Sequence, residues 1–131
     1  MTSAAALIID ILLKVIAGDP LRSVLEDGMA SQRSPYFGHP FRQWKNLPDD
    51  IVVGRYLSPA CYVEDSLPAV IYLAWKYAHD PEQGLIVNAH LGGDNAHRGA
   101  ILGALFGAAG GRDVFPDRWV TGLYEPVPNL L

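Results

Sequence analysis

The segment from Asn95 to Ala109, NAHRGAILGALFGAA, constrains the fold of this chain more than any other. It predicts a helix that is apolar or small on every face and that ends at the two glycines that follow it. Three glycines share one face of this helix, because they are four residues apart: Gly99, Gly103 and Gly107. Each glycine costs a helix roughly 1 kcal/mol relative to alanine. We therefore expect this face to pack closely against another backbone and the helix to be buried at the centre.

The other ordered segments also have a helical period, and none alternates as a strand would. We expect five further helices, bounded by capping residues, prolines and glycines. They are residues 3–17, capped by Ser3; 21–29; a helix from Asp65 or Ser66 with Pro68 in its first turn; 81–89, capped by Asp80; and a short helix before a tail at the end. The sequence thus predicts an all-α fold, a helical bundle forming a single domain over residues 1–131.

Residues 30–60 differ from the rest because they hold several prolines and aromatic residues and show no clear period. We expect a long ordered loop here, with one helical turn around residues 42–46. Since so long a loop is unusual inside a compact domain, it indicates a functional or interface role.

Composition excludes several classes of protein. The net charge is -4, and the ten Lys and Arg residues are spread along the chain, so no basic stripe favours nucleic-acid binding. A single cysteine cannot form an internal disulfide. The apolar run near the N-terminus is interrupted by Asp10 and Lys14, is too short to cross a bilayer and lacks the features of a signal peptide. We expect a cytoplasmic protein that does not bind membranes.

The residues before the central helix indicate a ligand site. Gly92 and Gly93 allow a ligand to approach the backbone, and the helix that begins near Asn95 presents free amide groups and a positive dipole end. Asp94 suits the N-cap position, but His97 and Arg98 oppose the dipole and are better explained by a nearby anion. A metal-bound diphosphate reconciles these charges, with Asp94 facing the metal and Arg98 facing the phosphate.

Two other kinds of site are less well supported by the residues. The spacing of His79, His90 and His97 matches no zinc pattern, and one cysteine adds little to it. Cys61 paired with a histidine could form a nucleophile, but no local signature supports this, and a lone cysteine is more often a small buried apolar residue.

Residues 91–119, LGGDNAHRGAILGALFGAAGGRDVFPDRW, resemble the C-terminal motif of the ADP-ribosylglycohydrolase family. Gly92, Gly93 and Asp94 match the family's glycine-glycine-aspartate turn, Gly99 to Gly107 match its small-residue helix, and Pro116 and Trp119 match its exit. The preceding segment, SLPAVIYLAWKYAHDPEQGLIVNAHLGGD, is similar to the helix pair that leads into the motif. The resemblance is best over residues 57–124, and it implies an all-α fold.

The resemblance also implies a magnesium-dependent hydrolase that cleaves the glycosidic bond of ADP-ribosylated substrates. In the family, the first acid of the motif, a second acid and a Thr or Ser hold magnesium together with an acidic cluster from the N-terminal half. Here Asp94 keeps the first position as the metal ligand, whereas Ala96 and His97 occupy the other two. Magnesium binding is therefore expected to be weak or lost, and no catalytic residue is assigned.

We accordingly expect a divergent or truncated ADP-ribosylglycohydrolase-like protein that is inactive as this chain alone. The family fold normally needs about twice this length, so the chain resembles its C-terminal half or a shortened relative. An ADP-ribose-type ligand would bind at Gly92, Gly93, Asn95, His97 and Arg98. The alternative is a non-enzymatic helical module that binds a partner protein, or a second copy, through exposed apolar surface, with the aromatic residues of 35–62 as the contact.

Overall fold

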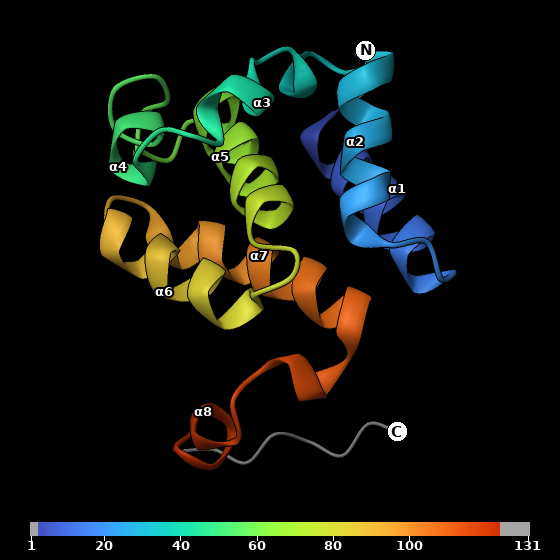
Figure 1. Ribbon diagram of the computed structural model, residues 1–131, viewed down its shortest axis with the longest axis vertical. Coiled ribbons are helices and arrows are strands. Elements are labelled where there is room, and N and C mark those ends of the chain that lie inside the picture. Colours follow the sequence, from blue (N-terminus) through green and yellow to red (C-terminus); the bar gives the residue numbers. More distant parts are fainter. Residues whose placement is uncertain (1–2, 124–131) are drawn as a thin grey trace.

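The computed structural model describes residues 3–123, and this part of the chain is all-α, as predicted (Figure 1). No strand forms within it, and Val53 and Leu57 make an isolated bridge. No helix among these residues has the length and apolar character needed to cross a bilayer. The helices are α1 (Ala4–Ile16), α2 (Leu21–Ser31), α3 (Phe41–Trp44), α4 (Asp49–Val52), α5 (Val63–Lys76), α6 (Pro81–Leu91), α7 (Asn95–Gly110) and α8 (Asp117–Thr121), with 3-10 turns η1 (Pro35–Phe37) and η2 (Arg112–Val114).

Local chemistry sets several of the helix ends. The Ser3 hydroxyl accepts a hydrogen bond from the amide of Ala6 at 3.1 Å, and the Asp80 carboxylate accepts one from the amide of Gln83 at 3.2 Å, so both predicted caps are confirmed. The prediction for α5 is wrong at its start, because the helix begins at Val63 and Pro68 therefore lies beyond the first turn. The predicted tail lies outside the described residues.

The segment 30–60 is more helical than the sequence predicts. It contains η1 and α4 as well as the expected turn, α3. Phe37, Phe41 and Trp44 are each at most 7% exposed, so these aromatic side chains belong to the core and are unavailable to a partner. Prolines begin these short helices, at Pro35 within η1 and at Pro40 and Pro48 before α3 and α4. The segment is thus an ordered part of the core.

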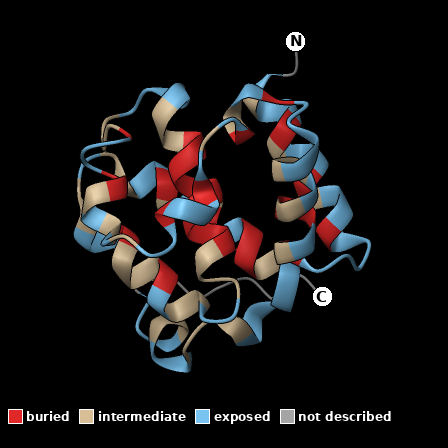
Figure 2. Ribbon diagram, turned by 45° about the horizontal axis from the view of Figure 1, so that its top comes forward, coloured by how far each residue is buried: buried red, intermediate tan, exposed pale blue. Residues whose placement is uncertain are grey.

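α5 is the central helix of the fold. Every residue from Leu67 to Trp75 is buried, and the helix contacts α2, α6, α7 and η1. Figure 2 shows the buried residues concentrated along the middle of the molecule, and Figure 1 shows α5 crossing α7 there. Charged residues are confined to the two ends of α5, and the buried Tyr72 and Trp75 donate hydrogen bonds, so the middle of the helix can be surrounded on all sides.

α7 is buried on one face only, so the expectation that it is surrounded is wrong. Leu102, Leu105 and Phe106 point into the core, whereas Ala96, Ala100 and Ala104 are exposed. A Cβ atom at Gly103 would have no neighbour within 4 Å. At Gly99 it would lie 3.1 Å from the Asn88 amide nitrogen, and at Gly107 it would lie 3.4 Å from the Phe115 ring. A tight contact therefore exists only at Gly99, and the neighbour there is a side chain and not the backbone that was expected.

Replacing Gly103 with alanine is expected to stabilise the protein by about 0.5–1 kcal/mol, because alanine has the higher helix propensity and the new methyl group meets nothing. Urea unfolding followed by circular dichroism measures the change. Gly28→Ala is the matched control, because its Cβ atom would lie 2.3 Å from the Phe37 ring and should destabilise the protein. A loss of stability in Gly103→Ala would mean that the glycine face is packed after all.

Candidate functional site

The glycine turn between α6 and α7 is held against the loop that precedes α5. Gly92 and Gly93 have φ angles of 67° and 59°, a backbone region that side chains disfavour. A Cβ atom at Gly93 would lie 2.2 Å from the carbonyl oxygen of Pro59, so only glycine fits there. The amide of Asp94 donates a hydrogen bond of 2.9 Å to the same oxygen. Gly93 thus permits the contact that fixes the turn, whereas no atom lies within 4 Å of a Cβ at Gly92.

Arg98 supports this turn from its buried side. The residue is 1% exposed, and its Nε donates to Asn88 Oδ1 at 3.0 Å. Its Nη1 donates to the carbonyl of Pro59 at 3.0 Å and its Nη2 to the carbonyl of Gly92 at 2.6 Å. Burial lowers the pKa of the guanidinium and the neighbouring Asp94 raises it, but arginine stays protonated under such shifts. Arg98 is therefore buried beneath the turn and bonded to its backbone, away from the solvent position where a phosphate contact was expected.

Asn88 on α6 is a site residue that sequence analysis missed. It is 3% exposed, and its Nδ2 donates to the carbonyl of Asn95 at 2.9 Å while its Oδ1 accepts from Arg98. One side chain thus joins α6, the first turn of α7 and the arginine. The signal that could have found it is an isolated asparagine in an otherwise apolar stretch of α6, since a buried amide needs hydrogen-bond partners.

Asp94 stands at the N-cap position of α7, but its side chain does not cap the helix. Its Oδ1 instead lies 2.5 Å from Nδ1 of His97, in a pair whose histidine side chain is 84% exposed and whose aspartate is 19% exposed. The capping role expected for Asp94 is therefore wrong. The amides of Asn95, Ala96 and His97 in the first turn receive no cap from Asp94, and Ala96 and His97 lie at the surface.

The residues at the turn do not fit a magnesium site. Magnesium requires near-octahedral oxygen coordination. Asp94 is the only carboxylate between Gly92 and Arg98, Ala96 has no side-chain oxygen, and His97 is a nitrogen donor. Nowhere in residues 3–123 do three or more His, Cys, Asp or Glu side chains gather as a metal centre needs. The hypothesis of a zinc site at His79, His90 and His97 therefore has no support among these residues. Cys61 is exposed.

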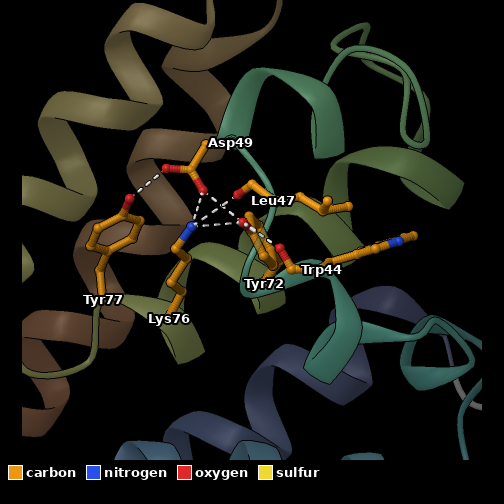
Figure 3. A network of polar contacts seen from close by, with 6 residues as sticks. All are labelled: Trp44, Leu47, Asp49, Tyr72, Lys76 and Tyr77. Carbon is orange, nitrogen blue, oxygen red and sulfur yellow. Dashed lines mark hydrogen bonds and ion pairs between the residues drawn. The ribbon is translucent and has the colours of Figure 1, made fainter.

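A second polar cluster surrounds Asp49 at the start of α4 (Figure 3). Its Oδ1 accepts hydrogen bonds from the Tyr72 hydroxyl at 2.6 Å and from Lys76 Nζ at 2.7 Å, and its Oδ2 accepts one from the Tyr77 hydroxyl. Tyr72 also donates to the carbonyl of Trp44 at 3.4 Å. The cluster attaches α3 and α4 to the central helix α5.

The charges in this cluster are mutually stabilised. Burial by itself would raise the pKa of Asp49, but the hydrogen bonds from Lys76, Tyr72 and Tyr77 outweigh burial and hold that pKa below its ordinary value. Burial and the Asp49 carboxylate raise the pKa of both tyrosines. All the polar groups are paired with one another, so the cluster is explained by its structural role.

A cavity among the described residues is remote from the glycine turn. It has a volume of about 740 Å³ and lies between α1 and α2, with Asp10, Lys14 and Arg33 at its polar edge and Ile11 and Phe37 among its apolar residues. None of its lining residues belongs to the turn. A ligand at Gly92–Arg98 would therefore bind at an exposed turn and not in this cavity.

Comparison with known proteins identifies the family. The sequence model described as ADP-ribosylglycohydrolase matches residues 2–130. The match is broader than the segment 57–124 on which the sequence resemblance was strongest, and it includes α1 and α2. No curated protein sequence and no solved structure matches the chain. Together with the all-α fold, the match shows that the chain belongs to the ADP-ribosylglycohydrolase family.

Proposed function

We propose that this chain binds the diphosphate of an ADP-ribose-type ligand at the turn Gly92–His97 and, as it stands, does not hydrolyse the glycosidic bond. The observation that carries the proposal is the uncapped first turn of α7. A helix start whose amides lack side-chain partners is a favourable place for an anion, because the amides can donate and the helix dipole is positive there. Membership of the family supplies the chemical class of the ligand.

The neighbouring side chains support binding in distinct ways. Gly92 leaves open space beside the turn, and Gly93 permits the close contact with Pro59 that fixes the backbone. His97 is largely exposed, and its imidazole can offer a hydrogen-bond donor to a ligand beside the turn. The Asp94 carboxylate opposes an anion, but one of its oxygens already contacts Nδ1 of His97. Arg98 acts indirectly, since its bonds to the carbonyls of Gly92 and Pro59 fix the conformation that presents the amides.

The proposal that the chain does not hydrolyse the glycosidic bond rests on the side chains of the turn that could bind a metal. The family suggests a metal-dependent hydrolase, but the turn supplies one carboxylate, and that carboxylate already contacts His97. No step of a metal-dependent reaction is therefore assigned to these residues.

We expect the purified chain to release no ADP-ribose from ADP-ribosylated serine or arginine peptides, with or without magnesium. Chromatographic detection of free ADP-ribose measures this, with an active member of the family as positive control. The variant carrying Ala96→Asp and His97→Thr restores two ligand positions, but it should stay inactive because a single turn cannot complete the oxygen coordination that magnesium needs. Turnover by the unmodified chain would contradict the proposal.

A non-enzymatic interaction role remains as a second proposal, but its contact surface changes. Of the aromatic residues in 35–62, Tyr56 and Tyr62 are 57% and 65% exposed, whereas Phe37, Phe41 and Trp44 are buried. Tyr56 also stacks on Trp44 with ring centroids 5.6 Å apart, so it extends the core cluster. The observation that favours an interaction role is on the outer face of α1, where Ile9, Leu13 and Ile16 are 56%, 62% and 68% exposed.

A further inference from the structure

The segment 30–60, whose length and composition indicate a functional role, contains most of a second cavity. This cavity has a volume of about 190 Å³ and lies where the end of α2 meets α3 and the residues just before α3. We call it the α2–α3 pocket. Its lining includes four polar side chains and the apolar Met29 and Phe41; the polar residues are Gln32, His39, Arg42 and Gln43.

The polar side chains of the pocket all carry N–H groups that can donate hydrogen bonds, and no lining residue is acidic. Within the part of the chain that the structure describes, none of the four side chains forms a hydrogen bond or an ion pair inside the protein. Four sets of free donors thus gather around one small cavity. In a chain whose net charge is -4, a cavity lined by a guanidinium and no carboxylate favours an anionic ligand.

The imidazole of His39 is held in position by aromatic side chains. Its ring centroid is 5.4 Å from that of Trp44 and 5.8 Å from that of Phe41. Burial lowers the pKa of His39, and the charge of Asp65 acts in the opposite direction. Because the net effect is a lower pKa, the imidazole is neutral at pH 7 and Arg42 carries the positive charge of the pocket.

The guanidinium of Arg42 is not neutralised by the nearby carboxylate of Glu26. Glu26 Oε1 accepts hydrogen bonds from the indole of Trp75 and from Arg22 Nε, each at 3.1 Å. These two bonds lower the pKa of Glu26, and the charge of Arg42 adds to the effect without forming an ion pair. Arg42 therefore remains available to a ligand.

Gln32 has an unusual backbone conformation at the edge of the pocket. It ends α2 with a φ angle of 49°, the only positive φ of a non-glycine residue in the described part of the chain. Glycine or asparagine is more usual at such a helix end, because other side chains destabilise this conformation. A glutamine at this position is explained if its side-chain amide contacts a ligand in the pocket.

The chemistry of the pocket fits a small organic carboxylate. The planar guanidinium of Arg42 matches the two oxygens of a carboxylate, and Met29 and Phe41 offer apolar contact to a hydrocarbon body. The volume lies below the range of about 300–1,000 Å³ that is typical of drug-sized ligands, so ADP-ribose is too large. We propose that the α2–α3 pocket binds a small carboxylate with a short apolar body through Arg42 and the side-chain amides of Gln32 and Gln43. This site is separate from the glycine turn.

Nuclear magnetic resonance of the labelled full chain, titrated with sodium benzoate up to about 50 mM at constant ionic strength, tests the proposal. The side-chain signals of Gln32, Arg42 and Gln43 should shift with one common dissociation constant in the millimolar range. The amides of residues 92–97 should not move, so this test is independent of the proposed diphosphate site. Benzamide is the matched ligand control, because it has the same shape without the charge and should produce no shift.

Two substitutions separate binding from folding. Arg42→Ala should raise the dissociation constant for benzoate at least about tenfold, because it removes charge-assisted hydrogen bonds, whereas Arg55→Ala, at another exposed arginine, should leave it unchanged. Gln32→Gly should raise the urea midpoint of unfolding by relieving the positive φ, and it should weaken benzoate binding at the same time. A purely structural role of Gln32 would change the midpoint alone. Circular dichroism verifies that each variant is folded.

Four results would overturn the proposal. They are an absence of shifts with benzoate, equal shifts with benzamide, unchanged binding in Arg42→Ala, and tighter binding of inorganic phosphate than of benzoate. The last result would mean that the pocket recognises an oxyanion without using its apolar residues.

Discussion

Replacing Arg98 with alanine is expected to lower the free energy of unfolding by about 4 kcal/mol. The substitution removes three hydrogen bonds from a charged donor, so Asn88 Oδ1 and the Gly92 carbonyl lose that donor, whereas the Pro59 carbonyl keeps the amide of Asp94. Hydrogen bonds to charged groups contribute about 1.5–3 kcal/mol each, and a buried acceptor that loses its donor carries a further cost. The volume of the buried side chain is lost at the same time. Urea unfolding monitored by circular dichroism measures the effect.

The controls for Arg98→Ala separate charge from position. Arg98→Lys keeps the charge but cannot reproduce the planar guanidinium contacts, so its stability should fall between those of the wild type and the alanine variant. Arg55→Ala removes an exposed arginine and should change stability by no more than about 0.5 kcal/mol. An Arg98→Ala variant that unfolds at the wild-type urea midpoint would show that the guanidinium does not hold the turn.

Replacing Asp49 with asparagine is expected to cost about 3 kcal/mol at neutral pH. Asparagine keeps the shape of the side chain, but Lys76 loses its counter-ion, and the amide nitrogen faces a hydroxyl that donated to the carboxylate. The carboxylate and the ammonium side chains are 15% and 18% exposed, so solvent screens the pair only partly. Asp50→Asn, at the neighbouring exposed aspartate, is the matched control and should have little effect.

The effect of Asp49→Asn should also depend on pH. The pKa of Asp49 is lower in the folded protein, so the ionised carboxylate adds stability above its unfolded pKa of about 3.9. This stability is lost as the pH falls through the folded pKa. The difference in unfolding free energy between wild type and Asp49→Asn should therefore be constant above about pH 5 and shrink below about pH 4. A difference that stays unchanged down to about pH 2 would contradict the role assigned to the carboxylate.

Residues that act over short stretches of chain explain what the sequence predicts well. Ser3 and Asp80 cap helices through amides three residues away, so their roles depend only on neighbours in the sequence. Such a local prediction is wrong at Asp94, because His97, also three residues away, binds the carboxylate that was expected to accept from the amides of α7. Periodicity alone cannot locate the buried face of α7, because each of its faces is apolar or small and several orientations would satisfy the pattern.

Contacts between distant parts of the chain explain what sequence reasoning missed at the site. Arg98 binds the carbonyl of Pro59, 39 positions earlier, and the side chain of Asn88, which belongs to the preceding helix. A backbone carbonyl has no sequence signature, so an arginine near a helix start could only be assigned to solvent or to an anion. The Asp49 cluster is similar, since Tyr72 and Lys76 reach it from α5 and Tyr77 reaches it from the residue that follows α5.

The proposal that the uncapped first turn of α7 binds a diphosphate is tested most directly by nuclear magnetic resonance of the labelled chain during titration with ADP-ribose. We predict that the amide signals of residues 93–97 shift at millimolar ligand and that His97→Ala weakens the response. Adenosine, which lacks the diphosphate, is the matched ligand control and should leave these amides unchanged. Magnesium should add little, since the turn does not fit that ion. If the amides do not shift with ADP-ribose, or shift equally with adenosine, the turn is not a phosphate site and the proposed function is wrong.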